Sequence, residues 1–334
     1  MKRLLIVGPT EYPWGGDGYG GIERLCALIT NGLAGRGHKV IAAVPQGSVL
    51  DNRVSQITVK ADPNDPFGEL VAYNATISVV SRGDVDFVID LSHKHLIRWK
   101  HEWPGFSWIW HDPYVAVHAK FPKSNVMALS QWQADRFKKA TGQDATVCDI
   151  HTVNEGYCWK DVPVSDRWVN LGRIDRDKGA DLAAIMFKEW GIGLDIIGPE
   201  VNPVIGDLLR VAESQTHGLI KWHGEVSENV KLDILHQAKG LFYWPADGFL
   251  EAHAMKLVEA LCCGVPCVVR DVGSYRDAFE GQGIALYKTE EDAQEDITCP
   301  FLFDAANRSR ISSEALAKWG LPAVLDRMEA LFGD

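Results

Sequence analysis

Short apolar runs alternate with longer amphipathic segments from one end of the chain to the other. Most of these runs are continuously apolar or β-branched, which is typical of strands buried on both faces of a parallel sheet. In the first half of the chain they cover residues 3–8, 39–44, 56–60, 86–91, 106–111, 125–130 and 145–150. Between the first two, residues 23–38 carry apolar side chains at helical spacing and end in glycines, so a right-handed parallel strand–helix–strand unit is predicted.

A second series of the same kind begins near Trp168. Its expected strands cover residues 167–172, 193–198, 218–224, 240–245 and 266–271, and its expected helices cover residues 181–191, 227–238 and 254–264. Two such series predict an α/β protein with two Rossmann-like, doubly wound domains facing a cleft. Strand ends and helix N-termini lining that cleft are natural places for phosphate groups.

The polar segment 158–167 lacks periodicity and is the expected linker. It separates a first domain at residues 1–160 from a second domain at residues 161–312, which are the acceptor-side and nucleotide-sugar-binding domains in the family that the motifs described below resemble. Residues 313–334 are expected to form helices, broken at Gly320–Pro322, that cross back to the N-terminal domain.

Composition narrows the class of protein. The 334 residues are 46% hydrophobic and 24% charged, as in ordinary globular proteins, and no apolar run is long enough to span a bilayer. The first residues are expected to form a strand, not a signal peptide. A net charge of −11 argues against nucleic-acid binding. Seven cysteines without framework spacing predict buried small side chains in a reducing cytoplasm.

No metal signature is present, because the sequence lacks HExxH and paired CxxC patterns. The D-x-D stretch at residues 84–86 leads directly into an expected strand and is interpreted as a turn. We therefore expect neither a metal ion nor another cofactor.

Five glycines lie between the first strand and the first helix, in residues 8–24. Glycines let a backbone approach a phosphate closely. No Walker sequence follows, and the acidic residue expected for a dinucleotide site is missing at Pro45 and Gln46. The segment is either a flexible turn, a weak dinucleotide loop, or a loop over a ligand's phosphate or an acceptor.

Two cations, Arg173 and Lys178, follow the first strand of the second series at the start of a helix. Cations are unfavourable at a helix N-terminus unless an anion is also there. A diphosphate clamp fits this pattern. Surface ion pairs with Asp175, Asp177 or Asp181 are the alternative.

Residues 251–259, EAHAMKLVE, place two glutamates eight positions apart. On one helix they would lie about 12 Å apart along the axis and about 80° apart in rotation, so they cannot share a proton. We expect Glu251 to precede the helix, with backbone amides between it and Glu259. The order carboxylate, amides, carboxylate matches sugar hydroxyls, diphosphate and ribose hydroxyls. Two solvated carboxylates are the alternative.

His93 and His111 follow strands and are expected at the cleft edge, although a strand-end histidine is usually structural. Residues 92–104 mix cations with aromatic side chains. They either contact a membrane surface or an acidic acceptor, or form a solvated face.

Several motifs together resemble glycosyltransferase family 4, the large retaining group with the GT-B fold. They are GYGGIERLCALITNGLAGRGHKV, SWIWHD, ALSQWQADRF, TVNEGY, LGRIDRDKGADL, IKWHGEV and EAHAMKLVEALCCGVPCVV, in family order between residues 19 and 286. The E-x7-E stretch with its G-x-P ending is the most specific of them.

The resemblance implies roles for individual residues. Glu251 would contact the donor sugar near the reacting carbon, and His111 would contact the transferred sugar. Arg173 and Lys178 would bind the diphosphate, and Glu259 would hold the ribose hydroxyls. Further donor-binding positions are Gly20, Gly21, Gly198 and the backbone of His253, Ala254 and Met255.

The chain departs from the family pattern beside the first glutamate. AHAM replaces the usual Phe-Gly pair, and WPADGF lacks the usual Ser or Thr. These differences leave the shape of the sugar pocket open.

The expected activity is metal-independent transfer of a hexosyl group, with retention, from a UDP-, GDP-, ADP- or dTDP-sugar to a hydroxyl acceptor. The acceptor could be a saccharide, a lipid-linked group or a small molecule. Alternatives are a sugar epimerase or phosphorylase of the same fold, a non-catalytic nucleotide-sugar or glycan-binding protein, and a nicotinamide oxidoreductase.

Overall fold

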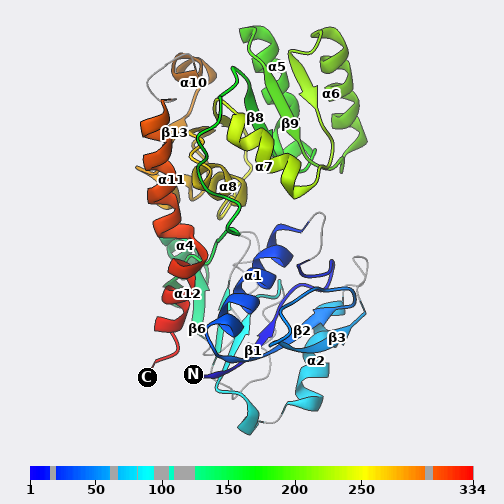
Figure 1. Ribbon diagram of the computed structural model, residues 1–334, viewed down its shortest axis with the longest axis vertical. Coiled ribbons are helices and arrows are strands. Elements are labelled where there is room, and N and C mark those ends of the chain that lie inside the picture. Colours follow the sequence, from blue (N-terminus) through cyan, green and yellow to red (C-terminus); the bar gives the residue numbers. More distant parts are fainter. Residues whose placement is uncertain are drawn as a thin grey trace. The chain divides into compact units, whose positions relative to one another are not determined.

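The computed structural model describes residues 1–15, 20–60, 67–80, 82–93, 105–108, 125–297 and 304–333 (Figure 1). The chain forms two compact units. One contains Met1–Thr152 together with the segment from Leu321 onward, and the other contains Val153–Gly320.

The first unit has a parallel sheet in the order β3-β2-β1-β4-β5-β6-β7 within the described residues. Its strands are β1 Arg3–Val7, β2 Lys39–Pro45, β3 Ser55–Val59, β4 Phe87–Asp90, β5 Gly105–Trp108, β6 Asn125–Ala128 and β7 Thr146–Val147. Each of the apolar runs predicted in this half overlaps one of these strands. The D-x-D stretch precedes β4 as predicted, and its Asp86 is ion-paired with Arg3 at 2.6 Å.

Helices cover both faces of this sheet. They are α1 Gly21–Gly35, α2 Gly68–Val79, α4 Gln131–Thr141 and α12 Leu321–Ala330. One buried cluster joins α1 and α12 to alternate side chains of β1 and β2, and α2 packs on the other face. The close contact between α1 and α12 is at Gly32, where a Cβ atom would lie 2.7 Å from Leu325.

The second unit has a parallel sheet in the order β10-β9-β8-β11-β12-β13 among its described residues. The strands are β8 Trp168–Leu171, β9 Leu194–Ile197, β10 Ile220–Trp222, β11 Leu241–Tyr243, β12 Cys267–Arg270 and β13 Ile284–Tyr287. The chain builds this sheet outward from β8 in one direction and from β11 in the other. The strand order therefore reverses between β8 and β11, and such a switch point is where ligands bind in open α/β sheets.

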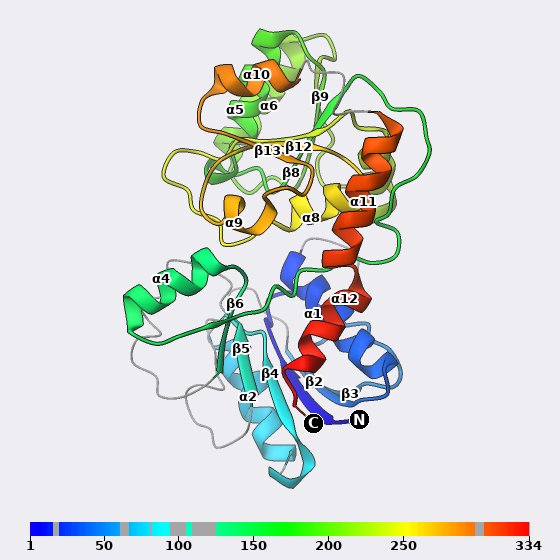
Figure 2. The same ribbon diagram turned by 90° about the vertical axis from the view of Figure 1, so that its left-hand side faces the viewer.

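Two groups of helices sandwich this second sheet. The helices are α5 Ala180–Trp190, α6 Pro203–Gln215, α7 Glu228–Gln237, α8 Met255–Cys262, α9 Tyr275–Phe279, α10 Glu290–Ile297 and α11 Ala305–Trp319. Figure 2 shows α8, α9 and α11 on one face and α5, α6 and α10 on the other, and the buried side chains divide the same way. The sequence predicted α5, α7 and α8, whereas β13, α6, α9 and α10 were not predicted.

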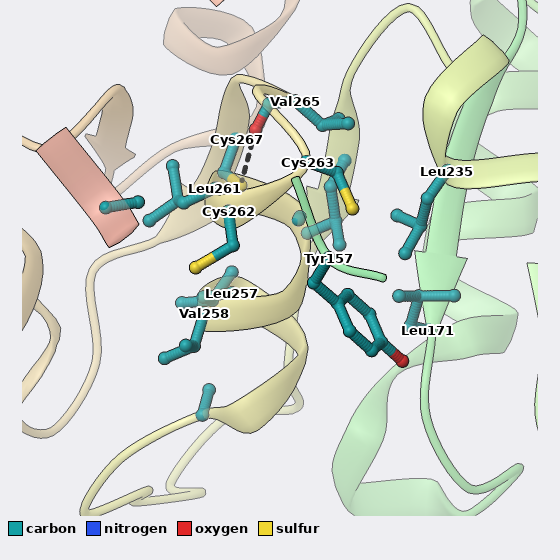
Figure 3. Close-up of a cluster of buried hydrophobic side chains, with 14 of the residues drawn as sticks. Tyr157, Leu171, Leu235, Leu257, Val258, Leu261, Cys262, Cys263, Val265 and Cys267 are labelled. Atoms are coloured by element: carbon teal, nitrogen blue, oxygen red, sulfur yellow. Dashed lines mark hydrogen bonds between the residues drawn. The ribbon is translucent and has the colours of Figure 1, made fainter. Parts of the chain in front are cut away.

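The core around α8 contains three of the cysteines. Cys262, Cys263 and Cys267 are all buried among leucines and valines (Figure 3). The thiols of Cys262 and Cys263 point in different directions, and that of Cys267 faces the carbonyl of Val265 at 3.5 Å. Burial raises the pKa of the Cys262 thiol to about 12, so it packs as a small neutral side chain.

Candidate active site

Two loops meet at the strand switch of the second unit. The first leaves β8 and carries Arg173 and Lys178, and the second leaves β11 and carries Glu251 before α8 begins at Met255. Because β8 and β11 are adjacent and parallel, both loops emerge at the same edge of the sheet.

Glu251 is held by donors from three different elements. Lys178 Nζ donates to Oε1 at 2.6 Å, and the hydroxyl of Tyr243, at the end of β11, donates to Oε2 at 3.0 Å. The hydroxyl of Tyr275, the first residue of α9, also donates to Oε2. The glutamate side chain is only 15% exposed, so these bonds replace those it would make with water.

Electrostatics keep this carboxylate ionised. Burial would raise the pKa of Glu251, but the charges of Lys178 and Lys256 and the hydrogen bonds from Lys178 and Tyr275 more than offset it and lower the pKa to about 2. Burial and the nearby charge of Glu251 raise the pKa values of Tyr243 and Tyr275, which therefore remain protonated donors.

The two predicted cations have different partners. Lys178 reaches across to Glu251 instead of pairing with a neighbouring aspartate, and its Nζ lies 4.6 Å from the centroid of the Phe249 ring. Arg173 lies 3.8 Å from Asp175, with its side chain 37% exposed. The alternative of local aspartate pairs thus describes Arg173 but is wrong for Lys178.

Glycines allow the site loops to pack closely. Gly179, directly after Lys178, has φ +63°, and a Cβ atom there would lie 2.0 Å from the carbonyl oxygen of Trp244. Gly198 has φ +156°, and its Cβ would lie 1.7 Å from the carbonyl oxygen of Gly172. Gly198 therefore has a packing role beside the loop that carries Arg173, whereas donor binding by Gly198 stays a prediction.

Ser274 holds the backbone between Glu251 and α8 in place. Ser274 donates to the carbonyl oxygen of Ala252, and Ala254 is the N-cap of α8 without a side-chain cap. Backbone N–H groups in the first turn of a helix have no intrahelical partner and favour anions. The expected layout of Glu251, helix-start amides and Glu259 is therefore present along the chain.

The side chain of His253 turns into the core of this unit. It is buried, with its ring centroid 4.7 Å from Phe279 and 6.3 Å from Trp319. The imidazole thus fills an aromatic cluster, and only the His253 backbone remains a candidate for donor contact.

Glu259 has its own set of partners on the other side of α8. Its carboxylate accepts from Lys231 Nζ at 3.0 Å and from the Tyr157 hydroxyl at 3.4 Å. Lys231 also lies 3.2 Å from Glu228. The two glutamates of the E-x7-E stretch are therefore stabilised by separate lysines, and both are buried or nearly so, which excludes the alternative of two solvated carboxylates.

Three residues of this site, Tyr243, Tyr275 and Lys256, were not predicted from the sequence. Tyr243 and Tyr275 hold Glu251 but lie in ordinary apolar segments, so no local pattern identifies them. Lys256 lies in the first turn of α8, with its Nζ buried. A cation at a helix N-terminus was the signal that identified Lys178, and it could also have identified Lys256.

Solved structures share this architecture over nearly the whole chain. AviGT4, a glycosyltransferase involved in avilamycin A biosynthesis, is 20% identical with a TM-score of 0.73, covering 99% of this chain and 97% of that one. Sucrose-phosphate synthase from Thermosynechococcus elongatus is 12% identical with a TM-score of 0.80, covering 99% and 98%. HepE of Anabaena, in complex with UDP-glucose, is 14% identical with a TM-score of 0.71, covering 99% of each chain.

At these identities the likeness establishes the GT-B fold. Among curated proteins, none matches the sequence. The family model described as glycosyl transferases group 1 matches residues 167–299, which contain Arg173, Lys178, Glu251 and Glu259. Residues 167–299 thus match the group 1 glycosyltransferases, and the solved structures share the fold of the whole chain. The prediction of the fold from the sequence is confirmed, and the matched segment contains the motifs at residues 171–182 and 251–259 that indicated the family.

The N-terminal unit contains three further residues that the sequence analysis identified, namely Gly20, Gly21 and His93. Gly20 is the N-cap of α1 with φ +142°, and Gly21 is the first residue of that helix. His93 Nδ1 donates to the buried carboxylate of Glu69 at 3.1 Å, and the same oxygen accepts from the His93 backbone N–H at 2.9 Å. Burial lowers the pKa of His93, but Glu69 more than offsets this and raises it.

Other expectations lie outside the described residues. They concern His111, residues 16–19 of the glycine-rich loop and residues 94–104 of the basic aromatic stretch. Within the described parts of the chain, no helix combines the length and apolarity needed to cross a bilayer.

The Lys178–Glu251 pair is expected to stabilise the fold measurably. A double-mutant cycle of Lys178→Met and Glu251→Gln, measured by denaturant unfolding, should give a coupling of about 1–3 kcal/mol near neutral pH. Because the pKa of Glu251 is lowered from 4.5 to about 2, the coupling should persist above pH 4.5 and disappear as pH falls toward 2.

The exposed Arg310–Glu314 pair on α11, at 2.8 Å, is the matched control, and its coupling should be at most about 0.5 kcal/mol. Equal couplings for the two pairs would contradict a special role for the buried pair.

Proposed function

We propose that this protein moves a hexosyl group, with retention of anomeric configuration, from a nucleotide diphosphate sugar to an acceptor hydroxyl without a metal ion. The observation that carries the proposal is the ion pair of Lys178 with the buried Glu251, located beside the start of α8 at the strand switch. It joins a cation suited to phosphate with a carboxylate suited to a sugar.

Lys178 can bind the diphosphate of the donor and at the same time hold the carboxylate proposed to bind the sugar. An ammonium group has three hydrogen-bond donors, and Glu251 accepts one of them at 2.6 Å. The others can reach phosphate oxygens while the pair stays intact. Arg173, whose aspartate partner is 3.8 Å away, can turn its guanidinium group toward the same diphosphate.

These charges address the difficulty of the reaction. The anomeric carbon becomes oxocarbenium-like while the diphosphate leaves as an anion. Arg173, Lys178 and the N-terminus of α8 would stabilise the leaving anion, and Glu251 would orient the sugar and offset its developing positive charge. We assign no protein base, because the leaving phosphate can accept the acceptor's proton.

The remaining donor contacts extend this arrangement. The backbone of His253, Ala254 and Met255 would bind phosphate, and Glu259 would hold the ribose hydroxyls from its place beside Lys231. Gly198, Gly20, Gly21 and His111 keep their proposed donor-site roles. The UDP-glucose complex of HepE supports a hexose donor, with UDP, GDP, ADP and dTDP as candidate nucleotides.

The proposed acceptor is a hydroxyl group. It belongs to a saccharide, a lipid-linked group or a small molecule. Contact of residues 92–104 with a membrane surface and a cytoplasmic location stay predictions.

Removing either cation should impair turnover. Arg173→Ala is expected to lower kcat by roughly 10²-fold, as for the loss of a single group that stabilises an oxyanion. Lys178→Ala should lose at least as much, because Lys178 also holds Glu251. Steady-state kinetics of sugar transfer measure both effects.

Arg210→Ala provides the control, because Arg210 lies half-exposed on α6 and pairs with Glu200 and Asp207. Its kcat should stay near that of the wild type. Wild-type turnover in both Arg173→Ala and Lys178→Ala would rule out the clamp.

Metal independence gives a separate test. A product assay with each candidate nucleotide sugar should detect a new glycoside and free nucleoside diphosphate, at equal rates with and without EDTA. Activity abolished by EDTA would contradict the metal-free mechanism. Donor binding without a glycoside for any acceptor would favour a binding protein, and an isomerised or phosphorylated sugar would favour an epimerase or phosphorylase.

A further inference from the structure

The mechanism above does not use Lys256, a lysine of the second unit whose charged group is buried. Lys256 is the second residue of α8, and its Nζ atom is buried without a hydrogen-bond acceptor among the described residues. The Nζ atom lies 3.2 Å from the centroid of the Tyr243 ring. A buried ammonium normally has a carboxylate or carbonyl partner, so this arrangement requires an explanation.

The position of this side chain relates it to the donor site. Its contact with Tyr243 places it at the end of β11, and a Cβ atom on Gly172 would lie 3.2 Å from its Nζ. Gly172 directly follows β8 and precedes Arg173. The Nζ atom therefore lies at the ends of β8 and β11, the strands that flank the switch point. It is next to the loop that carries Arg173 and Lys178.

The surrounding charges leave Lys256 without an anion of its own. Its electrostatic neighbours are the carboxylates of Glu251 and Glu259 and the cations Lys178 and Arg173. Glu251 is already bound to Lys178, and Glu259 is already bound to Lys231. The positive end of the α8 dipole adds a further unfavourable interaction for a cation in this first turn.

These surroundings disfavour the charged form of the Lys256 amine when the site holds no anion. Burial, followed by the charges of Lys178 and Arg173, lowers the pKa of Lys256 well below 10.5, although Glu251 and Glu259 act in the opposite direction. A doubly charged diphosphate at this edge of the sheet would reverse the balance, because it supplies the missing anionic partner.

We propose that Lys256 is a third cationic contact for the diphosphate of the donor, and that binding of the donor draws one proton from solvent onto its amine. The inference rests on the proposed function of the site. It explains why a lysine without an acidic partner occupies the first turn of α8. The proton joins the amine nitrogen, so charge gained on the protein balances charge brought by the ligand.

Calorimetry can detect this proton directly. Binding of the nucleotide sugar is measured in buffers of different ionisation enthalpy between about pH 7 and pH 9, where the diphosphate of an intact nucleotide sugar does not titrate. We expect the wild type to take up close to one proton more than Lys256→Met does over part of this range. We also expect Lys256→Met to bind roughly tenfold or more weakly, since it loses a charged hydrogen bond.

Two variants separate this effect from general damage. Lys188→Met changes an exposed lysine on α5, which bonds Gln215, and should leave affinity and proton uptake unchanged. Arg173→Ala should weaken binding and move the proton uptake to higher pH, because the charge of Arg173 contributes to the lowered pKa of Lys256.

The outcomes distinguish the two proposals. If the wild type binds none of the UDP-, GDP-, ADP- and dTDP-sugars, the proposed function is contradicted. If the wild type binds a nucleotide sugar but takes up no proton anywhere in this range, the inference about Lys256 is wrong while the proposed function stands. The same follows if Lys256→Met takes up as many protons as the wild type, and the wild-type measurement does not require the variant to fold.

Discussion

The geometry of the proposed donor site depends on one largely buried carboxylate, that of Glu251. Glu251 lies in a loop between β11 and α8, where no regular backbone structure fixes it. It is fixed instead by Lys178 from the β8 loop, Tyr243 from β11 and Tyr275 from α9. Because these three donors come from separate segments, the carboxylate ties together both sides of the strand switch. A change in any of them alters the position of the group proposed to orient the sugar.

Charge explains why these groups are assembled at this edge of the sheet. Arg173, Lys178 and the start of α8 produce an excess of positive potential, and Glu251 neutralises only part of it. Such an arrangement is unfavourable in an isolated protein and becomes favourable when a doubly charged ligand binds. Positive potential that exists before the reaction can stabilise a leaving diphosphate without reorganisation during the chemical step.

The fold of the protein was largely predictable from its sequence, because apolar runs buried on both faces of a sheet are visible as continuous patterns. The edge strand β13 was missed because its side chains are only half-buried and carry a weak signal. Arg173, Lys178, Glu251 and Glu259 were identifiable by charge at helix starts and by spacing. Their partners were not, since Lys231 reaches Glu259 across 28 positions, and Tyr275 reaches Glu251 across 24. The direction of the His253 side chain likewise depends on Phe279 and Trp319, which only the tertiary structure brings near.

The most direct test of the account is a crystal structure of the enzyme with an intact, non-transferable nucleotide sugar. The account predicts the diphosphate against Arg173, Lys178 and the first turn of α8, with the hexose at Glu251 and the ribose hydroxyls at Glu259. A diphosphate bound elsewhere, or a hexose beyond hydrogen-bonding reach of Glu251, would contradict it.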